Sequence, residues 1–187
     1  MEFSFSADRW LTPDEIASGR PLDRHFAVGL HVPGNFYKVI DLEECHLPEP
    51  ITVRLLNALR AFFKAKGWEP WDIRRHEGYL RHLVIRTGTR TGEAMVNLVT
   101  SRYDEARMAE LGAFLQEQFP EVTTLVNTIN SRPAQVSYGE ATYTIFGPGV
   151  IHDCIGPFRF EIAPDAFFQT NTEQAERLYE VARELAA

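Results

Sequence analysis

The 187-residue chain is poor in the features that most directly identify a class of protein. It has two cysteines, Cys45 and Cys154, far apart in the sequence, whereas a disulfide-stapled secreted domain carries more of them in a shorter chain. No apolar run approaches the roughly 20 residues of a membrane-spanning helix, and the N-terminal "MEFSFSADRW" lacks the basic start of a signal peptide. The sequence therefore predicts reduced, buried thiols and a soluble cytoplasmic protein without a membrane partner.

An excess of positive charge is also missing, because the formal net charge is -7. Proteins that bind nucleic acid by themselves usually carry a basic excess or a basic stripe, so any such surface here must be local. One concentration of arginines exists, formed by Arg74, Arg75, Arg81, Arg86 and Arg90. It is either a local RNA-binding surface or the solvated face of a strand, and charge alone favours the solvated face.

The chain has no phosphate-binding loop of the G-x-G-x-x-G or G-x-x-x-x-G-K-[ST] type, and "FGPGV" is better interpreted as a turn. His76 and His82 are six positions apart, which is not a zinc-binding spacing. We therefore predict no metal site. The scattered histidines do not define a hydrolytic triad either.

The apolar spacing, helix caps and turn residues of the sequence predict most of its secondary structure. "EFSFS" alternates like a half-buried strand, and "TPDEI" has Thr12 as a helix cap, Pro13 at the first helical position and Glu15 three residues after the cap. The other expected elements are two strands around a turn at 33–34, a helix over 51–67, a hairpin over 79–101, a helix over 104–119, a strand over 122–130, paired strands over 141–164 and a last helix from about 171. This order lacks a regular βαβ alternation, so it predicts an α+β fold with a largely antiparallel sheet and helices packed on it.

The end of the chain, "AFFQTNTEQAERLYEVARELAA", places Phe167, Phe168 and Gln169 just before a helix cap at Asn171 or Thr172. In a purely structural interpretation, one phenylalanine is a hydrophobic staple, the other lies in the core and the glutamine is solvated. In a functional interpretation, the glutamine amide pairs with the O4/N3 edge of a uracil and a ring stacks on an extruded base, an interaction worth roughly 1–3 kcal/mol. The helix itself is expected to direct the apolar residues Ala175, Leu178, Ala182 and Leu185 inward.

At these residues the chain resembles a known family. "FRFEIAPDAFFQTNTEQAERLYEVA" is similar to the segment that opens the catalytic domain of the S-adenosylmethionine-dependent RNA uracil-C5 methyltransferases, which form 5-methyluridine in ribosomal or transfer RNA. "MEFSFS", "RWLTPDEIASGRPLDRHFAVGLHVPGNFYKVIDLEECHLP", "GYLRHLVIR" and "GEAMVNLVT" follow the order of that family's central domain, so the resemblance covers nearly the whole chain. It implies that residues 1–160 form a central α+β domain. Residues 161–187 would then form the first strand and helix of a Rossmann-like methyltransferase domain.

The resemblance also implies a mechanism, in which a cysteine adds to C6 of a flipped uridine, C5 attacks the cofactor methyl group, and an acidic base removes the C5 proton. Phe167 and Gln169 match the family residues that contact the target uracil, and Phe168 and Asn171 are assigned to support. RNA contact is expected from Arg81 and Arg86. DNA is not an expected partner.

The cofactor loop, the acidic ribose contact, the cysteine nucleophile and the base of this family follow the helix with which the present chain ends, and Cys154 matches no nucleophile position. The resemblance therefore implies that these 187 residues contain no catalytic residue and only a small part of the S-adenosylmethionine site. It also implies that the chain is inactive by itself. Cys45 matches the fourth ligand position of an iron–sulfur cluster in some members, whose other three cysteines would precede Met1, so a cluster depends on residues outside this sequence. The alternative function is a non-catalytic RNA-binding or interaction module.

Overall fold

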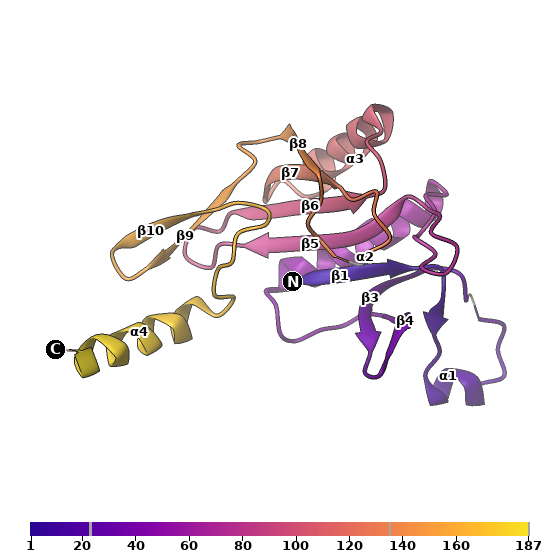
Figure 1. Ribbon diagram of the computed structural model, residues 1–187, viewed down its shortest axis with the longest axis horizontal. Helices are drawn as coiled ribbons and strands as arrows, with labels where there is room; N and C mark the ends of the chain where they lie inside the picture. The colour runs from indigo at the N-terminus through magenta and orange to yellow at the C-terminus, as the bar shows by residue number, and fades with distance from the viewer. Residues whose placement is uncertain (23, 135, 187) are drawn as a thin grey trace.

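The structure, a computed structural model, describes residues 1–22, 24–134 and 136–186 and consists of one large sheet, a small hairpin and helices (Figure 1). The elements are, in chain order, β1 (Glu2–Ser6), β2 (Arg9–Trp10), α1 (Pro13–Ala17), β3 (Ala27–Val32), β4 (Asn35–Asp41), α2 (Pro50–Ala65), β5 (Leu80–Thr87), β6 (Ala94–Thr100), α3 (Glu105–Gln118), β7 (Val122–Ile129), β8 (Ala141–Phe146), β9 (Ile151–Ile155), β10 (Phe158–Ile162) and α4 (Thr172–Ala186).

The large sheet has the strand order β2-β4-β3-β1-β5-β6-β7-β8. Its neighbours pair antiparallel except β2 with β4 and β6 with β7, and the second of these parallel pairs is joined through α3. The predicted α+β fold with a largely antiparallel sheet is thus confirmed. β9 and β10 pair only with each other among the described strands and form a separate hairpin.

Helices α2 and α3 cover one face of the sheet and enclose the main core. Phe3 and Phe5 of β1 point into this core, and Phe63 of α2 packs edge-on against Phe5 with the ring centroids 5.5 Å apart. The predicted apolar stripe of α2 is buried at Leu55, Leu56, Leu59 and Phe63. Apolar residues at helical spacing on α2 and at alternate positions on β1 therefore meet across one interface.

Several local signals give the predicted boundaries. Thr12 and Glu15 form a reciprocal capping box at the start of α1, and Asp104 caps α3 by accepting from the Arg107 amide. Gly67, with φ of 65°, ends α2 in the left-handed region that glycine adopts without steric strain.

The second face of the sheet is also covered, which the alternation in β1 did not predict. Ser4 and Ser6 are buried like Phe3 and Phe5. The connection between β7 and β8 crosses this face of the sheet (Figure 1). In that connection Ser137 donates a hydrogen bond to the carboxylate of Glu2. The expectation of a half-buried β1 was therefore wrong.

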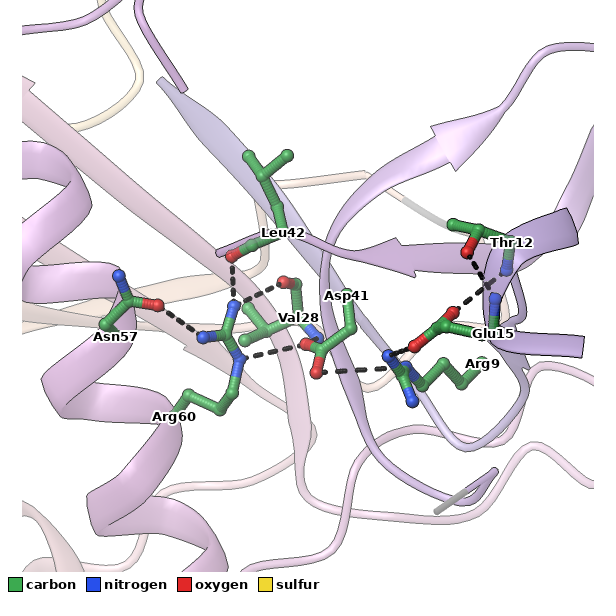
Figure 2. Close-up of polar contacts among 8 residues, drawn as sticks. All are labelled: Arg9, Thr12, Glu15, Val28, Asp41, Leu42, Asn57 and Arg60. Atoms are coloured by element: carbon green, nitrogen blue, oxygen red, sulfur yellow. Dashed lines mark hydrogen bonds and ion pairs between the residues drawn. The ribbon is translucent and has the colours of Figure 1, made fainter. Parts of the chain in front are cut away.

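A polar network joins the edge of the sheet to α1 and α2 (Figure 2). The carboxylate of Asp41 accepts hydrogen bonds from the Val28 amide and from Arg60 Nε, at 3.0 and 2.9 Å, and lies 3.9 Å from Arg9 Nε. Arg9 in turn pairs with Glu15. Asp41 is almost fully buried, so both arginines compensate for the water that its carboxylate loses.

Helix α4 extends away from the sheet (Figure 1), and its buried residues are Thr172 and Ala175 in the first turn. Leu178 and Leu185 have 58% and 85% of their surface exposed, so the expected inward face is wrong beyond Ala175. The predicted domain boundary after residue 160 falls within β10, and the division into two domains stays a prediction.

Among the helices of residues 1–22, 24–134 and 136–186, none has both the length and the apolarity needed to cross a membrane.

Candidate functional site

A cavity of about 790 Å³ lies where the start of α4 faces the ends of β1 and β5. Its walls come from β1 and β5, the loop that leads into α2, the small hairpin at Ile151 and Ile162, and the segment from Ala166 to Glu173. This last segment includes all four residues that the family resemblance assigns to the substrate. The lining includes Glu2, Arg86, Phe167, Phe168, Gln169 and Asn171.

The two adjacent phenylalanines have different environments. Phe168 packs on Met95, Ile151 and Ile162, and its ring lies 5.7 Å from that of Phe160. Phe167 is 86% exposed at the rim of the cavity. An exposure of this size does not fit a hydrophobic staple, so Phe167 is free to stack on a ligand while Phe168 holds the segment in place.

Gln169 is half-buried in the cavity wall, and Asn171 follows at the start of the helix. The Asn171 Oδ1 atom accepts a hydrogen bond of 3.0 Å from the Gln174 amide, so Asn171 is the cap of α4. Its side-chain oxygen is thus engaged by the helix. Of the two amides, that of Gln169 is the one that can offer both a donor and an acceptor to a base.

A buried carboxylate fixes the end of this segment. Asp153 of β9, only 1% exposed, accepts hydrogen bonds from the amides of Arg90 and Cys154 and, at 2.7 Å, from the hydroxyl of Thr172. Thr172 is the first residue of α4 and is itself buried. Asp153 therefore ties the start of α4, the hairpin of β9 and β10, and the turn between β5 and β6 to one another.

The turn between β5 and β6 sits closely on β9. A side chain at Gly88 would come within 2.2 Å of the His152 carbonyl oxygen, so only glycine permits this approach. The Thr91 hydroxyl donates to the same carbonyl, and Glu93 accepts from the His152 amide. These contacts attach the small hairpin to the large sheet next to Thr87, Thr89 and Ile151, which line the cavity.

Arg86 is the arginine in the described lining of the cavity. Burial lowers the pKa of its guanidinium, and the carboxylates of Asp165 and Glu2 act in the opposite direction. Its Nε atom is buried and has no hydrogen-bond partner among the described residues. This unused donor could bind an anionic or carbonyl oxygen of a ligand.

Arg81 is placed differently, and the prediction that it contacts RNA was wrong. It is fully buried, its guanidinium lies 4.2 Å from the centre of the Trp71 ring, and it donates to the carbonyl oxygens of Asn130, Arg132 and Ala134. Desolvation lowers its pKa to about 10. Arg81 therefore anchors the connection that crosses the second face of the sheet.

Comparison with known proteins identifies relatives of this chain. No protein-family profile matches the chain. An uncharacterized RNA methyltransferase of Chlorobaculum tepidum is 44% identical over 182 residues, which cover 96% of this chain, and one of Bacteroides thetaiotaomicron is 36% identical over 189 residues. The crystal structure of the Pyrococcus abyssi tRNA (uracil-54, C5)-methyltransferase in complex with S-adenosyl-L-homocysteine superposes over 99% of the chain, with a TM-score of 0.70 and 25% identity. The chain belongs to the RNA methyltransferase family.

Within this RNA methyltransferase family the chain corresponds to a part of each relative. It spans 38% of the Chlorobaculum protein, 41% of the Bacteroides protein and 40% of the Pyrococcus enzyme. The expected resemblance to uracil-C5 methyltransferases is confirmed at the level of family and fold. The roles of individual residues stay predictions.

Metal-ligating side chains do not gather in the part of the chain that the structure describes, where no group of three or more His, Cys, Asp or Glu residues could hold an ion. Cys45 and Cys154 are both free and half-buried. Whether Cys45 completes an iron–sulfur cluster stays a prediction that depends on cysteines outside these residues.

Sequence reasoning missed Asp153 as the anchor of the site. A signal existed in "VIHDCI", where Asp153 takes a position between Ile151 and Ile155 on the buried face of β9. A carboxylate at an inward position requires hydrogen-bond donors, and it marks a buried polar network.

Proposed function

We propose that this chain is part of an RNA methyltransferase that transfers a methyl group from S-adenosylmethionine to C5 of a uridine in ribosomal or transfer RNA. In this proposal the chain positions the RNA and supplies part of the uracil pocket. One observation carries it: Phe167 is exposed beside the half-buried amide of Gln169, at the rim of a cavity large enough for a nucleotide. The fold shared with the tRNA (uracil-54, C5)-methyltransferase supports the choice of uracil.

Different residues of the segment would hold different parts of an extruded base. Phe167 stacks on the face of the uracil, and the Gln169 amide donates to O4 and accepts from N3–H. Phe168 packs under the segment, and Asn171 and Asp153 fix its end at the start of α4. These contacts offset the few kcal/mol that extrusion of the base costs.

The residues present do not fit S-adenosylmethionine by themselves. A nucleoside cofactor of this kind is held by a glycine-rich loop that leads into a helix, and the described lining of the cavity contains no glycine. We therefore place the cofactor and the reacting cysteine in a part of the protein outside these residues. The two free cysteines are consistent with the reducing conditions of the cytoplasm, where we place the activity.

The 187-residue chain tested alone is expected to transfer no methyl group, because it offers neither a cofactor loop nor a cysteine at the reacting position. Labelled S-adenosylmethionine and a uridine-containing RNA would be incubated with the chain, and a full-length protein containing it would serve as the positive control. Incorporation above background by the chain alone would contradict the proposal.

Arg86→Ala in the full-length protein is expected to weaken RNA binding and to reduce the slope of log K against log salt by about 0.7–0.9, the value of one lost phosphate contact. Binding would be measured as a function of salt. Arg54→Ala is the matched control, because Arg54 is exposed on α2 and pairs with Glu121 away from the cavity. An unchanged slope for Arg86→Ala with a normal melting temperature would assign Arg86 to structure alone.

A non-catalytic RNA-binding module is the second candidate. An exposed aromatic ring beside an arginine binds single-stranded RNA without any chemistry, and Phe167 and Arg86 line the same cavity. A full-length protein that binds RNA at this cavity but forms no 5-methyluridine would favour this function.

A further inference from the structure

A second, separate pocket of about 350 Å³ lies on the face of the sheet opposite the helices. Its floor is formed by Asn97 of β6, Thr128 of β7 and Thr142 of β8. Its walls are the connection between β7 and β8, at Ser137–Gly139, and the residues Pro164 and Asp165. The family resemblance assigns no role to any of these residues.

The floor of the pocket is polar and only partly satisfied. The Thr128 hydroxyl lies 2.9 Å from Asn97 Oδ1, to which it donates, and 3.4 Å from the Thr142 hydroxyl. Asn97 is 2% exposed, and no hydrogen bond joins its Nδ2 atom to another described residue. This amide donor is therefore available to a ligand in the pocket.

The wall opposite Asp165 is held in place without a ligand. Arg81 binds the carbonyl oxygens of Asn130, Arg132 and Ala134 at the start of the connection, and Ser137 bonds to Glu2 in its middle. A pocket whose walls are fixed in advance loses little conformational entropy when it binds.

The negative charge of Asp165 limits the kind of ligand that this pocket can bind. Asp165 is an exposed carboxylate at the mouth of the pocket and repels phosphate, whereas it accepts hydrogen bonds from N–H groups. Among the four RNA bases, guanine presents two adjacent donors, N1–H and the N2 amine, which match the two oxygens of a carboxylate. Guanine O6 then lies on the same edge and can accept from an amide donor such as Asn97 Nδ2. Tyr138, 62% exposed in the wall, offers a ring for stacking.

We propose that this pocket binds a guanine base of the substrate RNA, read by Asp165 and Asn97. The inference rests on the proposed function, since it takes RNA to be the substrate. Pro164 and Asp165 lead directly into the segment 166–173 that lines the larger cavity, so one continuous stretch would hold both the target uridine and the guanine. The second pocket would thus contribute to the choice of uridine.

The test is a ¹H–¹⁵N titration of the chain with guanosine 5′-monophosphate, with inosine and adenosine 5′-monophosphates as probes that carry the same phosphate. We expect guanosine monophosphate to shift the side-chain amide of Asn97 at millimolar concentration. Inosine monophosphate, which lacks the N2 amine, should bind about tenfold more weakly, and adenosine monophosphate should leave Asn97 unchanged.

Asp165→Asn should remove the preference for guanosine over inosine monophosphate without lowering the melting temperature, because Asp165 is exposed. Glu161→Gln removes the same charge from the neighbouring strand β10, outside the pocket, and should bind like the unchanged chain. Equal responses to the guanosine and adenosine nucleotides, no shift at Asn97, or an unaltered preference in Asp165→Asn would overturn the inference. A full-length protein that makes no 5-methyluridine but still shows this guanine preference would refute the proposed function and leave the pocket assignment intact.

Discussion

Gln169→Ala in the full-length protein is expected to slow methyl transfer about 10- to 100-fold while the melting temperature and the overall RNA affinity stay nearly unchanged. A hydrogen-bonded base edge is worth roughly 1–3 kcal/mol, and this contact forms only once the base is extruded. RNA affinity depends mainly on phosphate contacts, which the substitution leaves intact. Single-turnover methylation rates, melting curves and RNA binding would be measured side by side. A normal methylation rate would remove Gln169 from the site.

The two phenylalanines provide the matched pair for this experiment. Phe167→Ala should also slow methylation, by the loss of stacking, and should not change stability, since the ring is 86% exposed. Phe168→Ala should lower the free energy of unfolding by about 1–3 kcal/mol, because its ring packs on Met95, Ile151 and Ile162. The opposite pattern, with Phe167→Ala destabilising the protein, would favour the purely structural interpretation of the motif.

Asp153→Ala is expected to lower the free energy of unfolding by about 3 kcal/mol and to loosen the start of α4. The substitution leaves three donors without an acceptor: the amides of Arg90 and Cys154 and the hydroxyl of Thr172. Each buried donor that loses its partner is unfavourable by about 1–3 kcal/mol, reduced where water can enter. Denaturant unfolding of the chain gives the stability, and hydrogen exchange at Ala175 reports the opening of the first turn.

Asp14→Ala is a suitable control for Asp153→Ala, because Asp14 is an exposed carboxylate in α1 and should change stability by less than about 0.5 kcal/mol. Thr172→Val removes only the hydroxyl that reaches Asp153 and should have a smaller effect than Asp153→Ala. If Asp153→Ala unfolds like the unchanged chain, with the same exchange rate at Ala175, the carboxylate does not anchor the segment.

The elements of the fold were predictable because their signals are local. The Thr12 capping box, the Asp104 cap and the glycine after α2 each act within a few residues, and apolar spacing distinguishes helix from strand. The chain order of strands and helices then restricted the fold to an α+β arrangement, which the sheet confirms.

The positions of polar side chains were less predictable, because they depend on contacts between distant residues. Arg81 and Arg86 belong to one strand, but a bulge between Leu80 and His82 interrupts the regular alternation of side chains at Arg81, and of the two only Arg86 lines the cavity. Arg81 is buried by a connection about 50 residues later in the chain, as its bonds to Asn130 and Ala134 show. The amphipathic pattern of α4 predicted a buried face, but the described residues cover only its first turn.

The contact between Thr172 and Asp153 also affects how the site responds to RNA. The stretch from Pro164 to Asn171 is short and lies between two fixed elements, strand β10 of the small hairpin on one side and the cap of α4 on the other. Fixing the backbone of a free segment on binding costs roughly 1–2 kcal/mol per residue. A stretch already restrained in the folded chain avoids most of this entropy loss, so Phe167 can be almost fully exposed to solvent and still meet an incoming base in a defined orientation.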